Sequence, residues 1–161
     1  MTMTNEPSTS TPTMMTDGVR VLGDEQTGRR VVAIRTLQAG EVLAELDGAQ
    51  RVPVATRYTV QVDVDAHIDG LWQFTFLNHS CAPNVRIDTT AMTISAVREV
   101  AAGEELGYFY PSTEWLMAEP FDCHCGSANC VGRVTGATDL AADVLATHWV
   151  NRHITELRAR G

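Results

Sequence analysis

Three of the four cysteines lie within eight residues of one another, and this cluster constrains the fold more than any other feature. Cys123, Cys125 and Cys130 form a C-x-C-x4-C pattern, FDCHCGSANC, in which Gly126 allows a tight turn. A disulfide within the C-x-C pair would close a ring too small for relaxed geometry. Thiolates at this spacing can instead bind one metal ion, as in tetrahedral structural zinc sites. The pattern therefore predicts a zinc site that holds these three cysteines.

The fourth ligand has two candidates. Cys81 is the remaining cysteine, but it lies 42 residues before Cys123, in NHSCAPN. His124 lies between two expected ligands and is the rival, since histidine also binds zinc. A solvent-facing turn position is the alternative interpretation of His124. The spacing alone leaves this choice open.

Length and charge narrow the class of protein. At 161 residues with 44% apolar residues, the chain has the size of one domain with a single core. No apolar run approaches the roughly 18 residues of a membrane span, so we expect no membrane insertion. The net charge of -8 disfavours direct nucleic-acid binding and favours a cationic partner. None of the 12 basic residues is lysine.

Residues 1–17, MTMTNEPSTSTPTMMTD, have the composition of a flexible, disordered tail. They are rich in Thr, Ser and Pro, and they cannot bury enough apolar surface to offset the entropy of ordering. They also lack the basic and apolar regions of a signal peptide. We therefore expect a cytoplasmic, reducing environment, in which cysteines bind metals more often than they form disulfides.

The rest of the chain alternates between short strands and turns. Apolar runs or alternating residues predict strands over residues 31–34, 42–46, 58–64, 84–88, 92–97 and 106–110. The strand at 58–64 alternates strictly, so one of its faces is expected to be polar and exposed. Short helical turns are expected over 71–77 and 112–117, and helical spacing predicts a longer helix over 139–160. The fold class is therefore β-rich α+β with a C-terminal helix.

Two segments of the chain are similar in sequence, and we call them the echo segments. The segments AIRTLQAGEVL (33–43) and AVREVAAGEEL (96–106) are identical at six of eleven positions. Each is expected to form a strand, a glycine-closed turn and a second strand. Two unrelated but similar turns are the alternative explanation, because Ala-Gly turns are common in β-rich domains.

Several motifs together indicate a family. NHSCAPN (78–84) resembles the NHSCxPN motif of SET-domain lysine methyltransferases, and GEELGYFY (103–110) resembles their GEELxYxY segment. The cysteine cluster is similar to the post-SET zinc motif, and GRRV (28–31) is similar to the segment that opens the domain. The motifs follow the family's order over residues 28–132.

The resemblance implies an architecture. It implies a fold of short twisted sheets with a pseudoknot, in which the NHSC segment passes through a loop made by the C-terminal segment. The SET domain would cover residues 18–118, the post-SET zinc segment 119–136, and a C-terminal helix packing on the domain 137–161. In this context we expect one structural Zn²⁺, with all four cysteines as ligands: Cys81, Cys123, Cys125 and Cys130.

The resemblance also implies S-adenosylmethionine (AdoMet) as the methyl donor. Asn78 and the backbone of His79 would hold AdoMet, with help from Arg29 and Arg30. Tyr58 is matched to a tyrosine that lines the cofactor and amine side. Here Arg30 replaces the second glycine of the family's opening Gly-x-Gly, so the approach of the cofactor can differ at this point.

Two tyrosines are matched to the family's catalytic positions. Tyr110 falls on the catalytic tyrosine, and Tyr108 on the position that tunes how many methyl groups are added. Methyl transfer needs nitrogen, methyl and sulfur in line, and it needs a neutral amine. The Tyr110 hydroxyl can orient that amine without acting as a full general base. A core strand with alternating aromatic residues is the alternative interpretation of Tyr108 and Tyr110.

Two further departures bear on the acceptor. Phe109 stands where the family frequently has aspartate, which removes a charge beside the expected active site. In addition, 31 residues separate Leu46 from Asn78, which is short for the insert that builds much of the peptide-binding cleft. A second subunit, as in a homodimer, or the C-terminal helix could complete the groove. Equally, the acceptor could be a free small amine.

Three functions follow. The leading hypothesis is an AdoMet-dependent N-methyltransferase that acts on a lysine side chain of a cationic protein or peptide. The alternative keeps the fold and the cofactor but changes the acceptor to a free amino acid or other small amine. The third is a non-catalytic, zinc-containing SET-like binding module. None of the three requires direct binding to nucleic acid or to a membrane.

Overall fold

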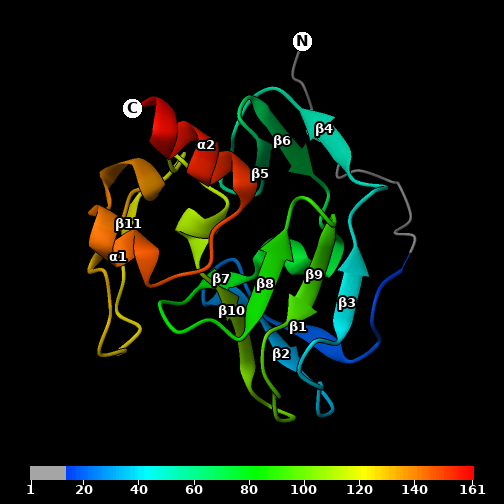
Figure 1. Ribbon diagram of the computed structural model, residues 1–161. Coiled ribbons are helices and arrows are strands. Elements are labelled where there is room, and N and C mark those ends of the chain that lie inside the picture. Colours follow the sequence, from blue (N-terminus) through cyan, green and yellow to red (C-terminus); the bar gives the residue numbers. More distant parts are fainter. Residues whose placement is uncertain (1–13) are drawn as a thin grey trace.

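Four small β-sheets form the framework of the structure, a computed structural model that describes residues 14–161 (Figure 1). The strands are β1 (Val19–Asp24), β2 (Gly28–Ala33), β3 (Val42–Glu45), β4 (Gln50–Val52), β5 (Val60–Asp63), β6 (Ala66–Asp69), β7 (Asn78–His79), β8 (Val85–Asp88), β9 (Thr93–Ala96), β10 (Glu105–Tyr108), β11 (Phe121–Asp122) and β12 (Arg133–Val134). The helical elements are the 3₁₀ turns η1 (Trp72–Phe76), η2 (Tyr110–Ser112) and η3 (Ala137–Asp139) and the helices α1 (Ala142–Ala146) and α2 (Arg152–Arg160). The β-rich α+β class is confirmed.

The sheets combine strands that are distant in sequence. Their orders are β1-β2-β10-β7, β3-β9-β8, β4-β6-β5 and β11-β12. All pairs are antiparallel except β7 and β10, which run parallel. The hairpin expected from 84–88 and 92–97 is confirmed as β8 and β9, and the short turn expected over 71–77 is confirmed as η1. In Figure 1 the segments from β11 to α2 (yellow to red) gather on one side of these sheets.

One apolar cluster joins the larger sheets. Val31 of β2 pairs with Leu106 of β10, and both side chains are completely buried. Leu43 of β3 and Ile87 of β8 are also completely buried in this cluster. Because burial of a Val, Leu or Ile side chain contributes about 1.5–3 kcal/mol each, this cluster is the main source of stability.

The echo segments pair with each other. Leu37 and Val100 exchange two backbone hydrogen bonds of 2.9 Å, so the two turns meet around a local two-fold relation. Gly40 and Gly103 occupy equivalent positions, and both have positive φ, at 82° and 88°. Both glycines are needed because other residues rarely adopt this conformation. The similarity of the segments therefore corresponds to a repeated and paired structure.

Residues 78–84 lie against two other segments. Ser80 N donates to Tyr108 O, and on the other side Asn129 Nδ2 donates to Cys81 O. Gly107 allows the approach to β10, because a Cβ there would lie 3.0 Å from the Ser80 Cβ. Residues 78–84 therefore contact both β10 and the loop that carries Cys125 and Cys130, and the pseudoknot itself stays a prediction.

The structure corrects two local predictions. No helix forms over 112–117, because the backbone N–H groups of Trp115 and Met117 donate to Gln61 Oε1 and Thr135 O. The single helix expected over 139–160 is divided into α1 and α2. At the division, the buried Asn151 side chain donates to the carbonyls of Ile87 and Ser112, which fixes an extended backbone there.

The structure also differs from expectation at the N-terminal end of the domain, whereas the C-terminal segment packs on the domain as expected. Residues 1–13 of the predicted tail lie outside the described residues, whereas Met14 and Thr16 hydrogen-bond the backbone of β3. At the other end, the Phe109 ring stacks on His148 at a centroid distance of 3.7 Å. Phe109 thus packs the C-terminal helical segment onto the domain, in the place where the family frequently has aspartate. Within residues 14–161, no helix is long and apolar enough to cross a membrane.

Candidate active site and metal centre

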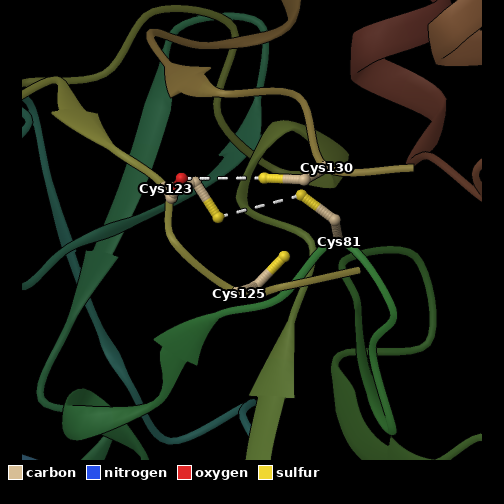
Figure 2. A group of neighbouring side chains, drawn as sticks. All are labelled: Cys81, Cys123, Cys125 and Cys130. Carbon is tan, nitrogen blue, oxygen red and sulfur yellow. Dashed lines mark hydrogen bonds between the residues drawn. The ribbon is translucent and has the colours of Figure 1, made fainter. Parts of the chain in front are cut away.

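The four cysteines meet in space. Their Sγ atoms all lie within 4.8 Å of one another and point toward a common centre (Figure 2). Cys81 follows β7, Cys123 follows β11, and Cys125 and Cys130 lie in the loop before β12. The loop is fixed in part by the hydrogen bond from Cys123 N to Gly132 O. The cluster therefore joins two segments that are distant in the sequence.

This arrangement fits a tetrahedral zinc site. At a Zn–S distance of about 2.3 Å, two thiolates on one Zn²⁺ lie about 3.8 Å apart. Cys81 Sγ and Cys123 Sγ are 3.9 Å apart. All four cysteines are free thiols, as the ring argument predicts for the C-x-C pair. His124 is exposed and is not part of the cluster, so the geometry favours Cys81 over His124 as the fourth ligand.

His79 connects the cysteine cluster to Tyr110. The backbone N–H of Tyr110 donates to His79 Nδ1 at 3.2 Å. Burial, with a smaller effect of His148, lowers the pKa of His79 to about 4, so the ring is neutral and carries its proton on Nε2. His79 Nε2 lies 3.2 Å from Cys81 Sγ. A hydrogen bond from this nitrogen orients the thiol, in the way that neighbouring groups orient metal ligands.

Two cavities share a wall at Tyr110. The larger has a volume of about 580 Å³ and the smaller about 370 Å³, and Leu77 also lines both. The Tyr110 hydroxyl donates to the Leu77 carbonyl oxygen, which fixes the ring at this junction. The ring of Tyr108, in the larger cavity, lies 4.8 Å from that of Tyr110. The two expected catalytic tyrosines are thus neighbours at the meeting point of the cavities.

Both tyrosines are neutral hydroxyl groups. Burial raises the pKa of Tyr108 and of Tyr110, and the nearby carboxyl group of Glu114 raises both further. A tyrosinate is therefore disfavoured at neutral pH. These hydroxyls can donate and accept hydrogen bonds, but they cannot act as strong bases.

Four of the five expected cofactor residues gather around the same junction. Asn78 and Tyr58 line both cavities, His79 lines the larger, and Arg29 lines the smaller. The Asn78 side chain donates to Arg29 O at 3.1 Å. Arg30 is different. It is exposed on β2 opposite Leu22 and lines neither cavity, because alternate residues of a strand point to opposite faces.

Comparisons with known proteins identify the family of the chain. The model of the SET domain family matches residues 28–111. The chain belongs to the SET-domain family. It is 38% identical over 125 residues to methyltransferase flvH of Aspergillus flavus, which covers 76% of this chain and 70% of that protein. It is 42% identical over 69 residues to a histone-lysine N-methyltransferase, H3 lysine-36 specific, of Chaetomium globosum, covering 39% of this chain and 8% of that protein.

Solved structures show the same SET fold. The methyltransferase domain of human histone-lysine N-methyltransferase SETMAR matches with a TM-score of 0.57 and 19% identity, covering 76% of this chain and 59% of that chain. KRYPTONITE, in complex with mCHG DNA and SAH, matches with a TM-score of 0.57 and 23% identity, covering 71% of this chain and 28% of that chain. The SET fold with its cysteine cluster, and the methyltransferase class, are therefore confirmed.

One residue of this SET-domain site was not expected from the sequence. Glu114 lines the larger cavity, and its residue exposure is 6%. Its carboxylate accepts a hydrogen bond from Gln61 N at 2.9 Å. Burial raises the pKa of Glu114 to about 7. Gln61 itself was expected on an exposed face of its strand, but it is buried because it pairs with residues 114–115. The sequence signal was an acidic residue beside Trp115 in the segment STEWLM.

Proposed function

We propose that this SET-domain protein is an AdoMet-dependent N-methyltransferase that acts on a lysine side chain of another protein. The observation that carries the proposal is Tyr110 at the wall between two cavities. A donor on one side and an amine on the other would meet at this residue, which supplies the alignment that methyl transfer requires. The chain contains no lysine, so the acceptor is not one of its own residues.

The residues around the junction fit AdoMet. Cavities of about 300–1,000 Å³ accommodate molecules of this size, and both cavities fall in that range. Asn78, the backbone of His79 and Arg29 would hold it, and Asp24 and Glu25 at the smaller cavity favour a cationic ligand. Bound AdoMet supplies a methyl group carried on a positively charged sulfur. Four cysteines would hold one structural Zn²⁺ beside this site.

The tyrosines position the amine. The Tyr110 hydroxyl donates to the Leu77 carbonyl, so its oxygen keeps a lone pair that can accept a hydrogen bond from the amine. Tyr108 limits the space beside the same nitrogen, and a second hydroxyl there restricts how many methyl groups the nitrogen can carry. The desolvated cavity favours the neutral amine, since burial lowers the pKa of an amine.

A free small amine is a second candidate acceptor. The insert between Leu46 and Asn78 builds β4, β5, β6 and η1, and its strands are only three or four residues long. Such a small insert offers little surface for a peptide. A homodimer would supply more surface. The homodimer and the cytoplasmic location stay predictions.

A labelled-AdoMet acceptor screen tests the proposal. The purified full chain is offered labelled AdoMet with a library of lysine-containing peptides and, in parallel, with a mixture of small amines. We expect label in the peptides, and none in matched peptides with arginine in place of lysine. Label in the small amines alone would support the second candidate. No binding of AdoMet by calorimetry would contradict both.

A further inference from the structure

Glu114 is a buried carboxyl group without a cationic partner. It lines the larger cavity together with Tyr108 and Tyr110. None of the ion pairs within residues 14–161 involves Glu114. Arg57 lines the same cavity, but its side chain is 64% exposed and lies 3.9 Å from Glu119. Ionised Glu114 is therefore a negative charge in a desolvated cavity, and such a charge is costly unless a cation joins it.

A ligand of this cavity can supply that cation. We propose that Glu114 binds the acceptor amine in its ammonium form and takes one proton from it, a role that rests on the proposed function. In this step one N–H bond breaks and an O–H bond forms on a Glu114 oxygen, while the electron pair stays on nitrogen. The neutral amine then forms a bond to the donor's methyl carbon as the C–S bond breaks, and sulfur keeps that pair. After the methylammonium product leaves, Glu114 releases its proton to solvent.

The other titratable groups of the cavity do not fit this role. The raised pKa values of Tyr108 and Tyr110 keep both hydroxyls protonated, so neither can take a proton at neutral pH. His79 has both ring nitrogens engaged, with the Tyr110 N–H and with Cys81 Sγ. Glu119 is exposed to solvent at its side chain by 62%. Asp122, His124 and Tyr58 are exposed as well, and the remaining titratable groups of the cavity, Cys123 and Cys125, belong to the cysteine cluster.

The properties of Glu114 match a proton acceptor. Its pKa of about 7 lies near neutral pH, where a group can both take and release a proton. The charged or titratable groups that face it are Tyr108 from β10 and Tyr110 from η2, whereas β5 presents the Gln61 N–H. Gln61 N holds one carboxylate oxygen in place, so the carboxylate is oriented before the amine arrives.

A binding assay that needs neither AdoMet nor the true acceptor tests whether Glu114 pairs with a cation. The full chain is titrated with n-butylammonium chloride, a lysine side-chain mimic, and with uncharged n-pentanol. Calorimetry measures the binding in each variant, and ¹³C signals of labelled glutamate carboxyls in the parent chain report which carboxyl group responds. We expect one carboxyl signal with a raised pKa to shift with n-butylammonium, and Glu114→Gln to weaken this binding by about 10- to 100-fold. The amide oxygen of glutamine still accepts from Gln61 N, so the fold is retained. Glu119→Gln, the matched control, should bind the probe as the parent chain does.

The results separate the inference from the proposed function. Equal n-butylammonium binding by Glu114→Gln and the parent chain would overturn the inference, as would an equal loss in Glu119→Gln. In the labelled-AdoMet screen, Glu114→Gln should lower turnover by about 10- to 100-fold and remove the rise in rate near pH 7, with AdoMet binding unchanged by calorimetry. If the parent chain binds no AdoMet, the proposed function fails, while the probe titration still decides the role of Glu114.

Discussion

The larger cavity has two walls that are held in place by different forces. The catalytic wall, so called for the role proposed for its tyrosines, consists of Leu71, Phe74, Asn78, Tyr108 and Tyr110. Most of these side chains belong to the main apolar cluster or pack against it. The cysteine wall consists of residues 117–125. It packs on a much smaller cluster, in which two of the three buried residues are the thiols Cys81 and Cys123.

The residues that carry the proposed chemistry and the residues that close the cavity therefore have different sources of stability. The catalytic wall carries the tyrosines and is stabilised by burial of apolar surface, so it forms without a metal ion. The cysteine wall packs on a cluster with only three buried residues among those the structure describes, so we expect metal coordination to contribute much of its stability. His79 connects the catalytic wall to the cluster on which the cysteine wall packs, because its ring contacts both Tyr110 N and Cys81 Sγ. Loss of metal should therefore open the site while the tyrosines stay in place.

The largest expected effect comes from breaking the cysteine wall. Cys123→Ser removes the buried central thiol, so we expect less than one zinc per chain and loss of activity to background. Limited proteolysis should cut residues 117–131 more than about ten times faster, while the core sheets stay protected. Zinc content by atomic absorption, activity and proteolysis on one preparation check this.

His124→Ala is the matched control for the cysteine wall. His124 lies between two of the cysteines but outside the cluster, so this variant should keep one zinc per chain and near-parental activity. Zinc loss in His124→Ala equal to that in Cys123→Ser would show that the histidine is a ligand after all. A fully loaded and active Cys123→Ser would contradict the separation of the two walls.

The next largest expected effect is on the rate of methyl transfer, through Tyr110 of the catalytic wall. Tyr110→Phe removes the hydroxyl at the junction, and we expect kcat to fall by about 100- to 1,000-fold, because one positioned hydrogen-bonding group is lost. AdoMet affinity should change by less than about threefold, and zinc content should not change. Tyr108→Phe is the matched control. It keeps the ring and should change the number of methyl groups added, as mass spectrometry of the product would show. Parental turnover by Tyr110→Phe would remove this residue from the mechanism.

A third prediction concerns the stability cost of Glu114. Its pKa is about 7 in the folded chain and near 4.5 when unfolded, so the folded state binds more protons between these values. Its contribution to folding is therefore present below pH 4.5 and is lost as pH rises through 7. Relative to the parent chain, Glu114→Gln should have the same stability at pH 4.5 and be more stable at pH 8, by on the order of 3 kcal/mol. Urea unfolding at both pH values checks this, and a pH-independent difference would contradict it.

The cysteine wall was the easier of the two to predict. A C-x-C-x4-C pattern constrains the backbone locally, so the clustering of three cysteines followed from spacing, and that of Cys81 followed from the resemblance of the NHSC motif. Tyr108, Tyr110 and Asn78 were proposed as site residues in the same way, because each lies inside a contiguous motif, and the structure places all three at the larger cavity. Local patterns of this kind can be recognised without knowledge of the tertiary fold.

Side chains that depend on contacts between distant parts of the chain could not be predicted from the sequence. Glu114 and Gln61 are 53 residues apart, and each looks like an exposed polar residue until β5 and the segment after η2 are brought together. Asn151 divides the C-terminal helix because it reaches Ile87, which is 64 residues away. Arg30 lies outside both cavities for a simpler reason, since the alternation of β2 directs it to the other face from Arg29, which the motif match does not take into account. Each of these side chains depends on partners that no local pattern identifies.

The smallest expected effect concerns the echo segments, residues 33–43 and 96–106, which differ in how they support the catalytic wall. Glu41 and Glu104 occupy equivalent positions, and each pairs with an arginine, at 2.9 and 2.6 Å. Glu104 alone also accepts from Asn84 Nδ2, and Asn84 in turn accepts from Gly107 N, which precedes Tyr108.

Glu104→Gln should therefore lower the melting temperature by about 2–4 °C, and Glu41→Gln by less than about 2 °C, because exposed ion pairs contribute little by themselves. Differential scanning calorimetry of both variants at pH 7 measures the difference. Equal shifts of the melting temperature would mean that the hydrogen bonds through Asn84 add no stability. The two turns would then stabilise the fold equally, although they lead to strands of different function.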